Sequence, residues 1–236
     1  MLWPTIATIS GVALLLALGT WQLQRLQWKQ GLMAHIAERV HAAPVAIEAV
    51  LDEASHGADA EYTHVQARGR FRHDLERFVY APGQGDWGWD VITPLELAGG
   101  RALLVNRGYV PRQLKAQSDR AAGLLAGEVT VIGLLRQSPA SRPWYIPAGN
   151  RADHTWSWFE VSEIAESMYG TGGKAIATLY LDADATDNRT PPAGGATRLE
   201  LPNRHLEYAV TWYGLAAALA GLYGFAWVRH FRPRGG

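Results

Sequence analysis

A single histidine at the start of an apolar segment is the residue best placed to do chemistry in this sequence. Residues 203–228 run NRHLEYAVTWYGLAAALAGLYGFAWV, with no charged side chain after Glu207. At 100° per residue, Tyr208 and Trp212 fall on the same helical face as His205. Neutral imidazole is a common axial ligand of haem iron. An imidazole above an apolar, aromatic strip therefore predicts a haem site.

The same three residues also have a purely structural interpretation. Tyrosine and tryptophan are enriched at the membrane–water interface, where a histidine can be solvated among lipid headgroups. Ionisable groups at membrane depth usually have a functional reason, but that rule weakens at the interface. The residues alone leave both interpretations open.

Arginines near the two apolar segments are candidates to pair with the propionates of a haem. Arg25 and Arg204 both lie close to the ends of these segments, and arginine pairs well with carboxylates. Trp21, Arg25 and Trp28 are spaced i, i+4, i+7, so they share a helical face. Asn203 is a good N-cap residue, which predicts that the second helix starts at Arg204.

Two apolar segments are long enough to cross a membrane. Met1–Gln24 and Tyr208–Val228 contain no charged side chain, and about 20 helical residues cross the hydrocarbon core. We therefore predict transmembrane helices at 4–23 and 207–228. A cleaved signal peptide with a small-residue site at 17–19 is the alternative for the first segment, although no basic residue precedes it.

The first helix is predicted to continue beyond the membrane as far as about residue 42. Leu26, Met33, Ala37 and Val40 extend a helical apolar stripe, and Pro44 then stops the helix. Two spans place both termini on one side. The basic tail 229–236 indicates the cytoplasm for that side, so the region between the spans is expected to be extracytoplasmic, on a cell (inner) membrane.

Residues 44–203 have the pattern of a β-rich domain. From about residue 60, apolar and polar residues alternate, and Gly, Pro, Asn and Asp separate the runs. A short helix is expected at 162–170, with Ser162 as its N-cap. The predicted fold has two transmembrane helices flanking a mainly antiparallel sheet or small barrel with short helices. The candidate strands are 62–71, 77–83, 89–97, 101–111, 127–136, 156–161 and 175–182.

Composition and motifs exclude several classes of function. The formal net charge is 0, which gives no basic field for nucleic acid. The chain has no cysteine, which excludes disulfides and thiolate metal sites. We find no nucleophile elbow, zinc-protease motif or phosphate-binding glycine loop. The other histidines show no ligand spacing, so the sequence indicates no enzyme.

Three blocks of sequence together resemble the surfeit locus protein 1 family. They are LGTWQLQRLQWK at 18–29, LLVNRGYVPR at 103–112 and NRHLEYAVTWYGLA at 203–216. The blocks stand in the family's order and spacing, and the resemblance covers essentially the whole chain. Mitochondrial members have insertions in the β domain that this chain lacks, so its compactness resembles the bacterial type.

The resemblance implies an assembly factor for haem–copper cytochrome c oxidase that binds or positions haem a for insertion into subunit I. It implies His205 as the ligand of the haem iron and subunit I as a partner, together with membrane lipid and, as a further candidate, haem a synthase. Arg204 stands where the family often has Asn or Glu. The alternative is a cofactor-free scaffold that stabilises nascent subunit I. The positions matching family motifs are Gly19, Trp21, Gln22, Arg25, Trp28, Asn106, Arg107, Gly108, Pro111, Tyr208, Thr211 and Trp212.

The middle block has a structural interpretation of its own. Asn106-Arg107-Gly108 within a strand predicts a bulge or turn, in which Gly108 adopts an unusual backbone angle. Arg107 has two open roles, pairing with a buried carboxylate or facing a partner. A membrane-bound enzyme is the third functional class, and a pocket holding a strongly perturbed carboxyl group would favour it.

Overall fold

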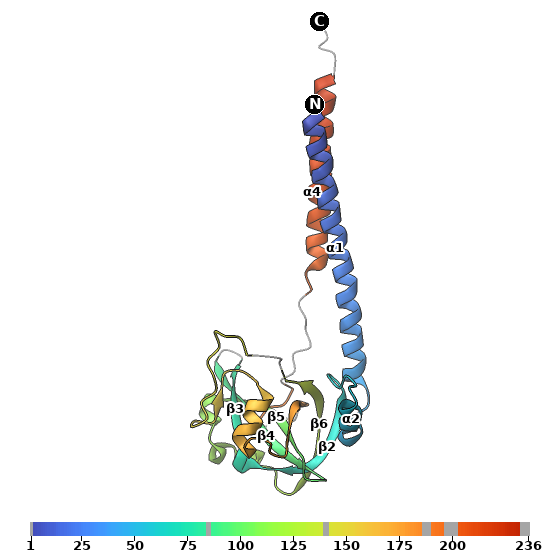
Figure 1. Cartoon of the computed structure of the whole chain (residues 1–236). Coiled ribbons are helices and arrows are strands. Elements are labelled where there is room, and N and C mark those ends of the chain that lie inside the picture. The colour runs from blue at the N-terminus through green and yellow to red at the C-terminus, as the bar shows by residue number, and fades with distance from the viewer. Residues whose placement is uncertain (1, 84–85, 139–141, 186–189, 196–202, 232–236) are drawn as a thin grey trace. The chain divides into compact units, whose positions relative to one another are not determined.

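The computed structural model describes all residues except 1, 84–85, 139–141, 186–189, 196–202 and 232–236 (Figure 1). The chain divides into two compact units. One comprises Met1–Ala37 with Leu199–Gly236, and the other comprises Glu38–Arg198. Each unit is described separately below.

The first unit is formed by two long apolar helices. α1 spans Leu2–His41 and α4 spans His205–Phe231. Their most apolar windows have mean hydropathies of 1.8 and 1.3, and only 6% and 11% of those windows is buried. Helices of this length and composition can cross a membrane, and the scarcity of burial distinguishes them from core helices of a soluble domain.

The two helices pack antiparallel through small residues. Near one end Thr5 hydrogen-bonds Tyr223, and near the other the Thr20 and Tyr213 hydroxyls lie 3.0 Å apart. Gly19 is buried, and a Cβ added there would meet the Tyr213 ring at 2.9 Å. Glycine therefore sets how closely the helices approach, as small residues do in membrane helix pairs.

The start of α4 differs from the prediction. The helix begins at His205 rather than Arg204, and the Arg204 carbonyl accepts the Tyr208 amide at 3.2 Å. Asn203 Oδ1 is buried without a hydrogen-bond partner. The predicted Asn203 cap is therefore wrong, because Arg204 occupies the capping position. Of the predicted basic tail, 229–231 belong to α4 and 232–236 lie outside the described residues.

The second unit contains a closed barrel. Five strands pair in the order β2–β6–β8–β5–β4, and a β4–β2 pairing closes the ring. β3 adds to β4, while the two-residue strands β1 and β7 add at the edges. The predicted fold class, two terminal apolar helices flanking a β domain with short helices, is confirmed. The strands are β1 Val45–Ala46, β2 His64–Phe71, β3 Arg77–Pro82, β4 Trp87–Leu97, β5 Ala102–Pro111, β6 Glu128–Gln137, β7 Thr155–Trp156 and β8 Ala175–Ala183.

Strand pairing and local structure depart from expectation in a few places. The sheet is mainly antiparallel, as predicted, but the pairing of β5 with β8 is parallel, as are the short edge pairings of β1 with β2 and β7 with β3. Of the strand predicted at 156–161, only β7 forms, and Val161 already begins α3 (Val161–Tyr169). Glu160, not Ser162, precedes that helix, and it makes no side-chain cap. The Ser162 cap is wrong because the capping position, Glu160, lies two residues earlier.

Short helices pack against the barrel, and their packing explains why a strand such as β5 is apolar on both faces. α2 (Ile47–Ser55), which we did not predict, buries Ile47, Val50 and Leu51. Along β5, Leu103 packs into the core beneath α2, whereas Leu104 packs into a second core with α3. Both faces of β5 are thus buried, which explains its unbroken apolar run. Three 3-10 helices complete the domain, η1 His73–Leu75, η2 Arg112–Leu114 and η3 Gln117–Gly123.

Candidate functional site

The helix pair places one side chain directly against His205. His205 Nδ1 lies 2.7 Å from Gln22 Oε1, across the contact between α4 and α1. Both residues are half-buried. Gln22 stands in the first turns after the apolar part of α1 and His205 opens α4, so the antiparallel packing brings the two together.

This hydrogen bond fits one tautomer of the neutral imidazole. An amide carbonyl oxygen only accepts, so Nδ1–H donates to Gln22 Oε1. Nε2 then carries the lone pair, and the described residues offer it no hydrogen bond. Metal-binding histidines characteristically donate the second ring N–H to an oxygen in this way, which orients the ring and raises its basicity.

Two of the three aromatic residues predicted around His205 have exposed side chains. Trp21 is 52% exposed and Tyr208 is 51% exposed, while Trp212 is half-buried. Large exposed aromatics on helices of this kind offer apolar surface to lipid or to a flat ligand. Among the described residues, none of these three aromatic side chains forms a hydrogen bond with His205.

The two predicted arginines, Arg25 on α1 and Arg204 just before α4, are differently engaged. The Arg25 guanidinium lies 4.3 Å from the centre of the Trp28 ring, a cation–π contact. Arg204 is 4.0 Å from Glu207, and both are 74% exposed, so this pair adds little stability. Both cations remain accessible to an anionic group.

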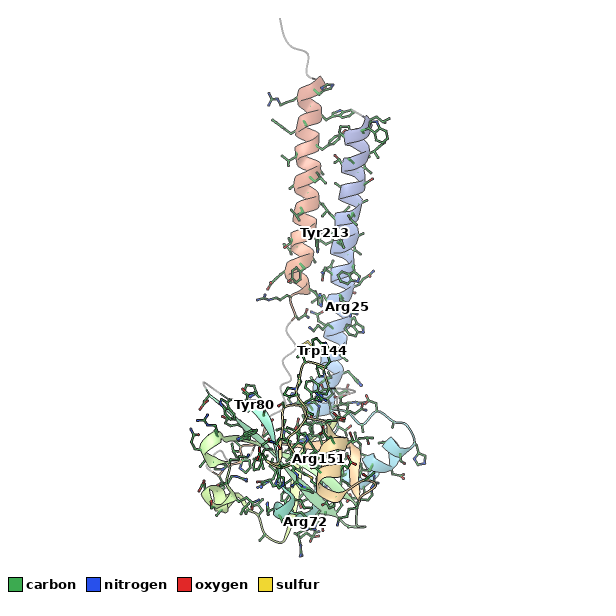
Figure 2. All side chains as sticks on the ribbon, turned by 60° about the vertical axis from the view of Figure 1, so that its left-hand side comes forward. Arg25, Arg72, Tyr80, Trp144, Arg151 and Tyr213 are labelled. Carbon is green, nitrogen blue, oxygen red and sulfur yellow. The ribbon has the colours of Figure 1, made fainter. Side chains whose placement is uncertain are left out.

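Sequence reasoning missed Tyr213 and the pairing role of Gln22. Figure 2 shows Tyr213 on the side of α4 that faces α1, where its ring covers Gly19 and its hydroxyl meets Thr20. The available signal was a glycine one residue before Thr20, since a glycine inside an apolar helix marks a close approach. Which residue of the other helix packs over this glycine can be known only from the tertiary structure.

The middle block forms a bulge in β5. Asp90 pairs with Tyr109 and Ile92 with Asn106, so β5 has one extra residue there. Gly108 has φ +105°, and a Cβ there would lie 1.8 Å from the Ala193 carbonyl oxygen. Only glycine fits that position. Asn106 stabilises the bulge by accepting the Gly108 amide and donating to Asp182.

Arg107 lines a cavity, and it forms no ion pair with the described residues. It is 8% exposed, and its Nη2–H donates to the Gly123 carbonyl. Glu76, a buried carboxylate whose charge acts on Arg107, is held by Arg120, which is fully buried beside it. Among the described residues, pairing of Arg107 with a buried carboxylate is therefore wrong.

Three described carboxyl groups have pKa values lowered by a neighbouring donor. A hydrogen bond from Arg72 lowers the pKa of Asp74, one from Lys174 lowers that of Glu96, and one from Thr171 lowers that of Glu166. General acids at neutral pH need the opposite shift. The described residues also contain no group of three side chains able to hold a metal ion.

Comparison with known proteins shows the family. The model of the SURF1 family matches residues 10–217. The chain is 34% identical to surfeit locus protein 1 of Rattus norvegicus over 92% of this chain and 72% of the relative. It is likewise 34% identical to the Homo sapiens protein, over 91% and 73%.

A relative from a third organism gives the same result. A SURF1-like protein of Monosiga brevicollis is 32% identical over 93% of this chain and 85% of the relative. The matched region runs from the apolar part of α1 to the middle of α4, so it includes both His205 and Gln22. The chain belongs to the SURF1 family.

Proposed function

We propose that this protein is an assembly factor for haem–copper cytochrome c oxidase and that it holds haem a, as cargo, for insertion into subunit I. Membership of the SURF1 family supports the assembly role, because the resemblance to that family implies a factor for oxidase assembly. The haem role is supported chiefly by one observation, the 2.7 Å hydrogen bond from His205 Nδ1 to Gln22 Oε1.

The residues of the helix pair suit a haem better than a bare metal ion. A structural metal site needs several protein ligands, and the described residues contain no such group. A haem brings four nitrogen ligands of its own and needs one imidazole. His205 would supply that ligand through Nε2. Tyr208, Trp212 and Trp21 would offer apolar surface to the macrocycle, and Arg25 would offer charge to a propionate.

Holding cargo requires no chemistry on it, and we propose that the protein is not an enzyme. One axial histidine whose second nitrogen is held by a neutral amide would bind haem and release it more readily than a ligand paired with a carboxylate. Subunit I, and haem a synthase as donor, would then be partners that meet the same lipid-embedded helices. We place the protein in the cell (inner) membrane with its β domain extracytoplasmic.

The test is absorption spectroscopy of the detergent-solubilised full chain purified from cells that make haem A. We expect a haem a spectrum from the native chain and its loss or shift in His205→Ala. His35→Ala is the matched control, because His35 lies on α1 with an exposed side chain, and it should leave the spectrum unchanged. Circular dichroism shows whether each variant is folded.

Two other results would change the proposal. A native chain without haem under these conditions would remove the haem role and leave a cofactor-free scaffold that stabilises nascent subunit I. A haem spectrum that His205→Ala leaves unchanged would keep haem binding but assign the ligand to another residue.

A further inference from the structure

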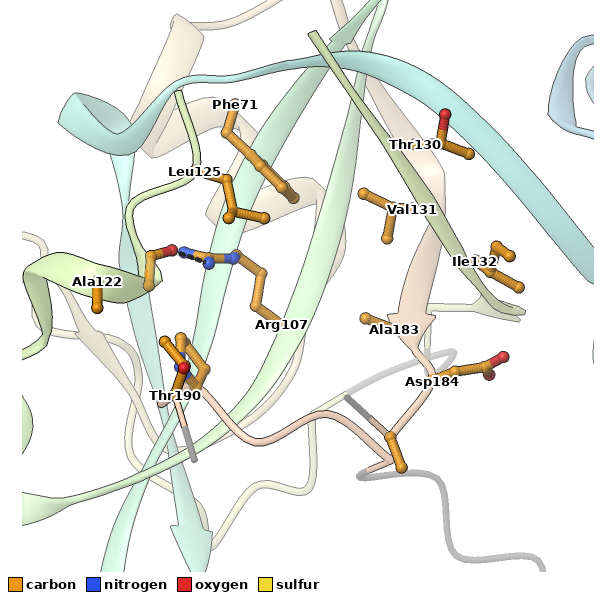
Figure 3. Close-up of a pocket in the computed structure, with 13 residues that line it drawn as sticks. Phe71, Arg107, Ala122, Leu125, Thr130, Val131, Ile132, Ala183, Asp184 and Thr190 are labelled. Atoms are coloured by element: carbon orange, nitrogen blue, oxygen red, sulfur yellow. Dashed lines mark hydrogen bonds between the residues drawn. The ribbon is translucent and has the colours of Figure 1, made fainter. Parts of the chain in front are cut away.

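The β domain contains a cavity that the helix-pair proposal does not use. Its volume is about 580 Å³, and it opens between β2, β6, β8 and the end of η3. Cavities of roughly 300–1,000 Å³ are typical of sites for small organic molecules. Figure 3 shows Phe71 and Leu125 on one side and Val131 and Ile132 on another, so the lining is mainly apolar.

One buried cation reaches this apolar space. Arg107 is more than nine-tenths buried, and its Nη1 has no hydrogen-bond partner among the described residues. Its guanidinium carbon lies 4.9 Å from the centre of the Phe71 ring, and Nη2–H donates to Gly123 (Figure 3). One edge of the guanidinium is thus fixed by protein, and Nη1 on the other edge is buried and unpaired among the described residues. A buried charged donor without a partner is costly.

The backbone around Arg107 holds the guanidinium in this orientation. The β5 bulge sets the direction of the side chain, and Gly108 allows the Ala193 backbone to approach. Gly123, whose carbonyl accepts from Arg107, is itself pressed against Pro191, where a Cβ would lie 2.2 Å from the carbonyl oxygen. Close backbone packing on both sides makes this a preorganised position rather than a loose surface arginine.

Among the described residues, the charge on Arg107 has no direct counter-ion. Arg120 donates to both carboxylate oxygens of Glu76, one of them at 3.1 Å. Burial lowers the pKa of Arg107 to about 10, with Glu76 raising it and Arg120 lowering it. The guanidinium therefore stays charged at neutral pH. Asp184, on another side of the cavity, is engaged by His64 at 2.8 Å.

We propose that this cavity binds a small apolar acid whose carboxylate accepts hydrogen bonds from Arg107. The apolar body would lie against Phe71, Val131 and Ile132. A single cation matches a single negative charge, and the Asp184 carboxylate would oppose a second one. A monocarboxylate therefore fits better than a phosphate. This site is independent of the haem proposal, since all its residues belong to the β domain.

Binding of a model acid to the full chain in lipid nanodiscs tests the proposal. We would titrate naphthalene-2-carboxylate by calorimetry, subtract empty nanodiscs, and repeat with the uncharged naphthalene-2-carboxamide. Charge-assisted hydrogen bonds are strong, so we expect the amide to bind about tenfold more weakly or worse. Arg107→Gln should weaken binding of the acid by a similar factor and leave binding of the amide unchanged.

Two further variants guard against misfolding and non-specific charge effects. Ala122→Trp fills the cavity from an exposed lining position while retaining Arg107, and it should abolish binding of both probes. Arg112→Gln removes an exposed cation outside the cavity lining and should change neither. If Arg107→Gln fails to fold, the acid–amide comparison and Ala122→Trp decide.

The proposal fails if the acid and the amide bind equally, or if Ala122→Trp leaves binding intact. It also fails if the acid does not bind the native chain at all. Nη1 would then be satisfied by water, as buried polar groups often are.

Discussion

At the scale of single residues, the contact between His205 and Gln22 decides which imidazole nitrogen can bind a metal. Nδ1 is committed to Gln22 Oε1 at 2.7 Å, which leaves Nε2 as the ligand atom in the proposed haem site. Arg107 is a second residue whose role depends on one neighbour, because Glu76 pairs with Arg120 instead. Both assignments give measurable consequences.

Replacing Gln22 tests the orientation of the ligand. Gln22→Leu removes the acceptor at similar size, and we expect about 10- to 100-fold weaker haem a binding, the usual effect of losing such a partner. Gln22→Glu keeps an oxygen acceptor and should restore binding, with a lower midpoint potential because a carboxylate makes the imidazole more basic. Haem titration and potentiometry measure both effects. Equal affinity in Gln22→Leu and the native chain would contradict the role.

The pH dependence of stability tests the pairing of His64 in the β domain. Burial lowers its pKa, but hydrogen bonds to the Ala42 carbonyl and Asp184 outweigh burial, so the pKa is raised above 6.5. The two ring nitrogens both face acceptors, at 2.9 and 2.8 Å, which favours the charged form. This stabilisation is complete below the unfolded pKa and is lost as pH rises through the folded pKa.

The variant His64→Gln should therefore lower the unfolding temperature of the β domain most at about pH 6, and much less at about pH 8.5. Tryptophan fluorescence during heating measures this difference. His35→Gln, at an exposed position on α1, should show no such pH dependence. A His64→Gln effect that stays constant with pH would mean that the charge on the imidazole is not involved.

At the scale of elements, glycine determines how closely two backbones approach. Gly19 lies beneath the Tyr213 ring in the helix pair, and Gly108 lies beneath the Ala193 backbone in the barrel. At Gly19 there is no room for a side chain. At Gly108 there is no room either, and the backbone also has a positive φ.

The Gly19 contact is tested by cross-linking. The chain has no cysteine, so the pair Gly11→Cys and Leu219→Cys would give a unique disulfide between α1 and α4, whose side chains meet there. Adding Gly19→Val should slow its formation several-fold, because the new side chain pushes Tyr213 away. Gly31→Ala, with open space around it, should not. Equal rates in both would show that Gly19 does not set the helix spacing.

The bulge is tested by comparing two glycines with positive φ. Gly108→Ala should destabilise the β domain by more than about 2 kcal/mol, since it adds a backbone clash to conformational strain. Gly127 has φ +82°, and a Cβ added there would meet nothing within 4 Å. Gly127→Ala should therefore lower the free energy of unfolding only by the backbone strain, about 1 kcal/mol. Denaturant unfolding measures both. Similar losses would remove the close approach of Ala193 as the cause.

At the scale of the whole molecule, the prediction concerns membrane topology. The two helices can each cross a membrane, and the basic residues after Val228 predict cytoplasmic termini. Because the chain lacks cysteine, single cysteines report sidedness without background. Ala58→Cys should react with an impermeant maleimide in intact cells, and Gly236→Cys only after lysis. The reverse pattern would place the β domain in the cytoplasm.

Much of the fold follows from local patterns in the sequence. The two charge-free segments predict both long helices, because a hydrocarbon core admits little else. The alternation along β2, with Val65, Ala67 and Phe71 buried, predicts a strand with one face inward. α2 was missed although Ile47, Val50 and Leu51 have helical spacing, since nine residues give a weak periodic signal.

Parallel pairing of β5 with β8 required the tertiary structure, because the partner of a strand is chosen by packing and loop closure rather than by its own residues. By itself the sequence determined the two spans, the β domain between them and His205 as the candidate ligand, since each depends on residue type and spacing along one segment. Only the tertiary structure decided that Gln22 holds His205, that Tyr213 covers Gly19 and that Arg107 faces a cavity with no counter-ion among the described residues. Each of these is a contact between residues far apart in the chain, and a short-range pattern carries no information about which distant side chain will fill a given space.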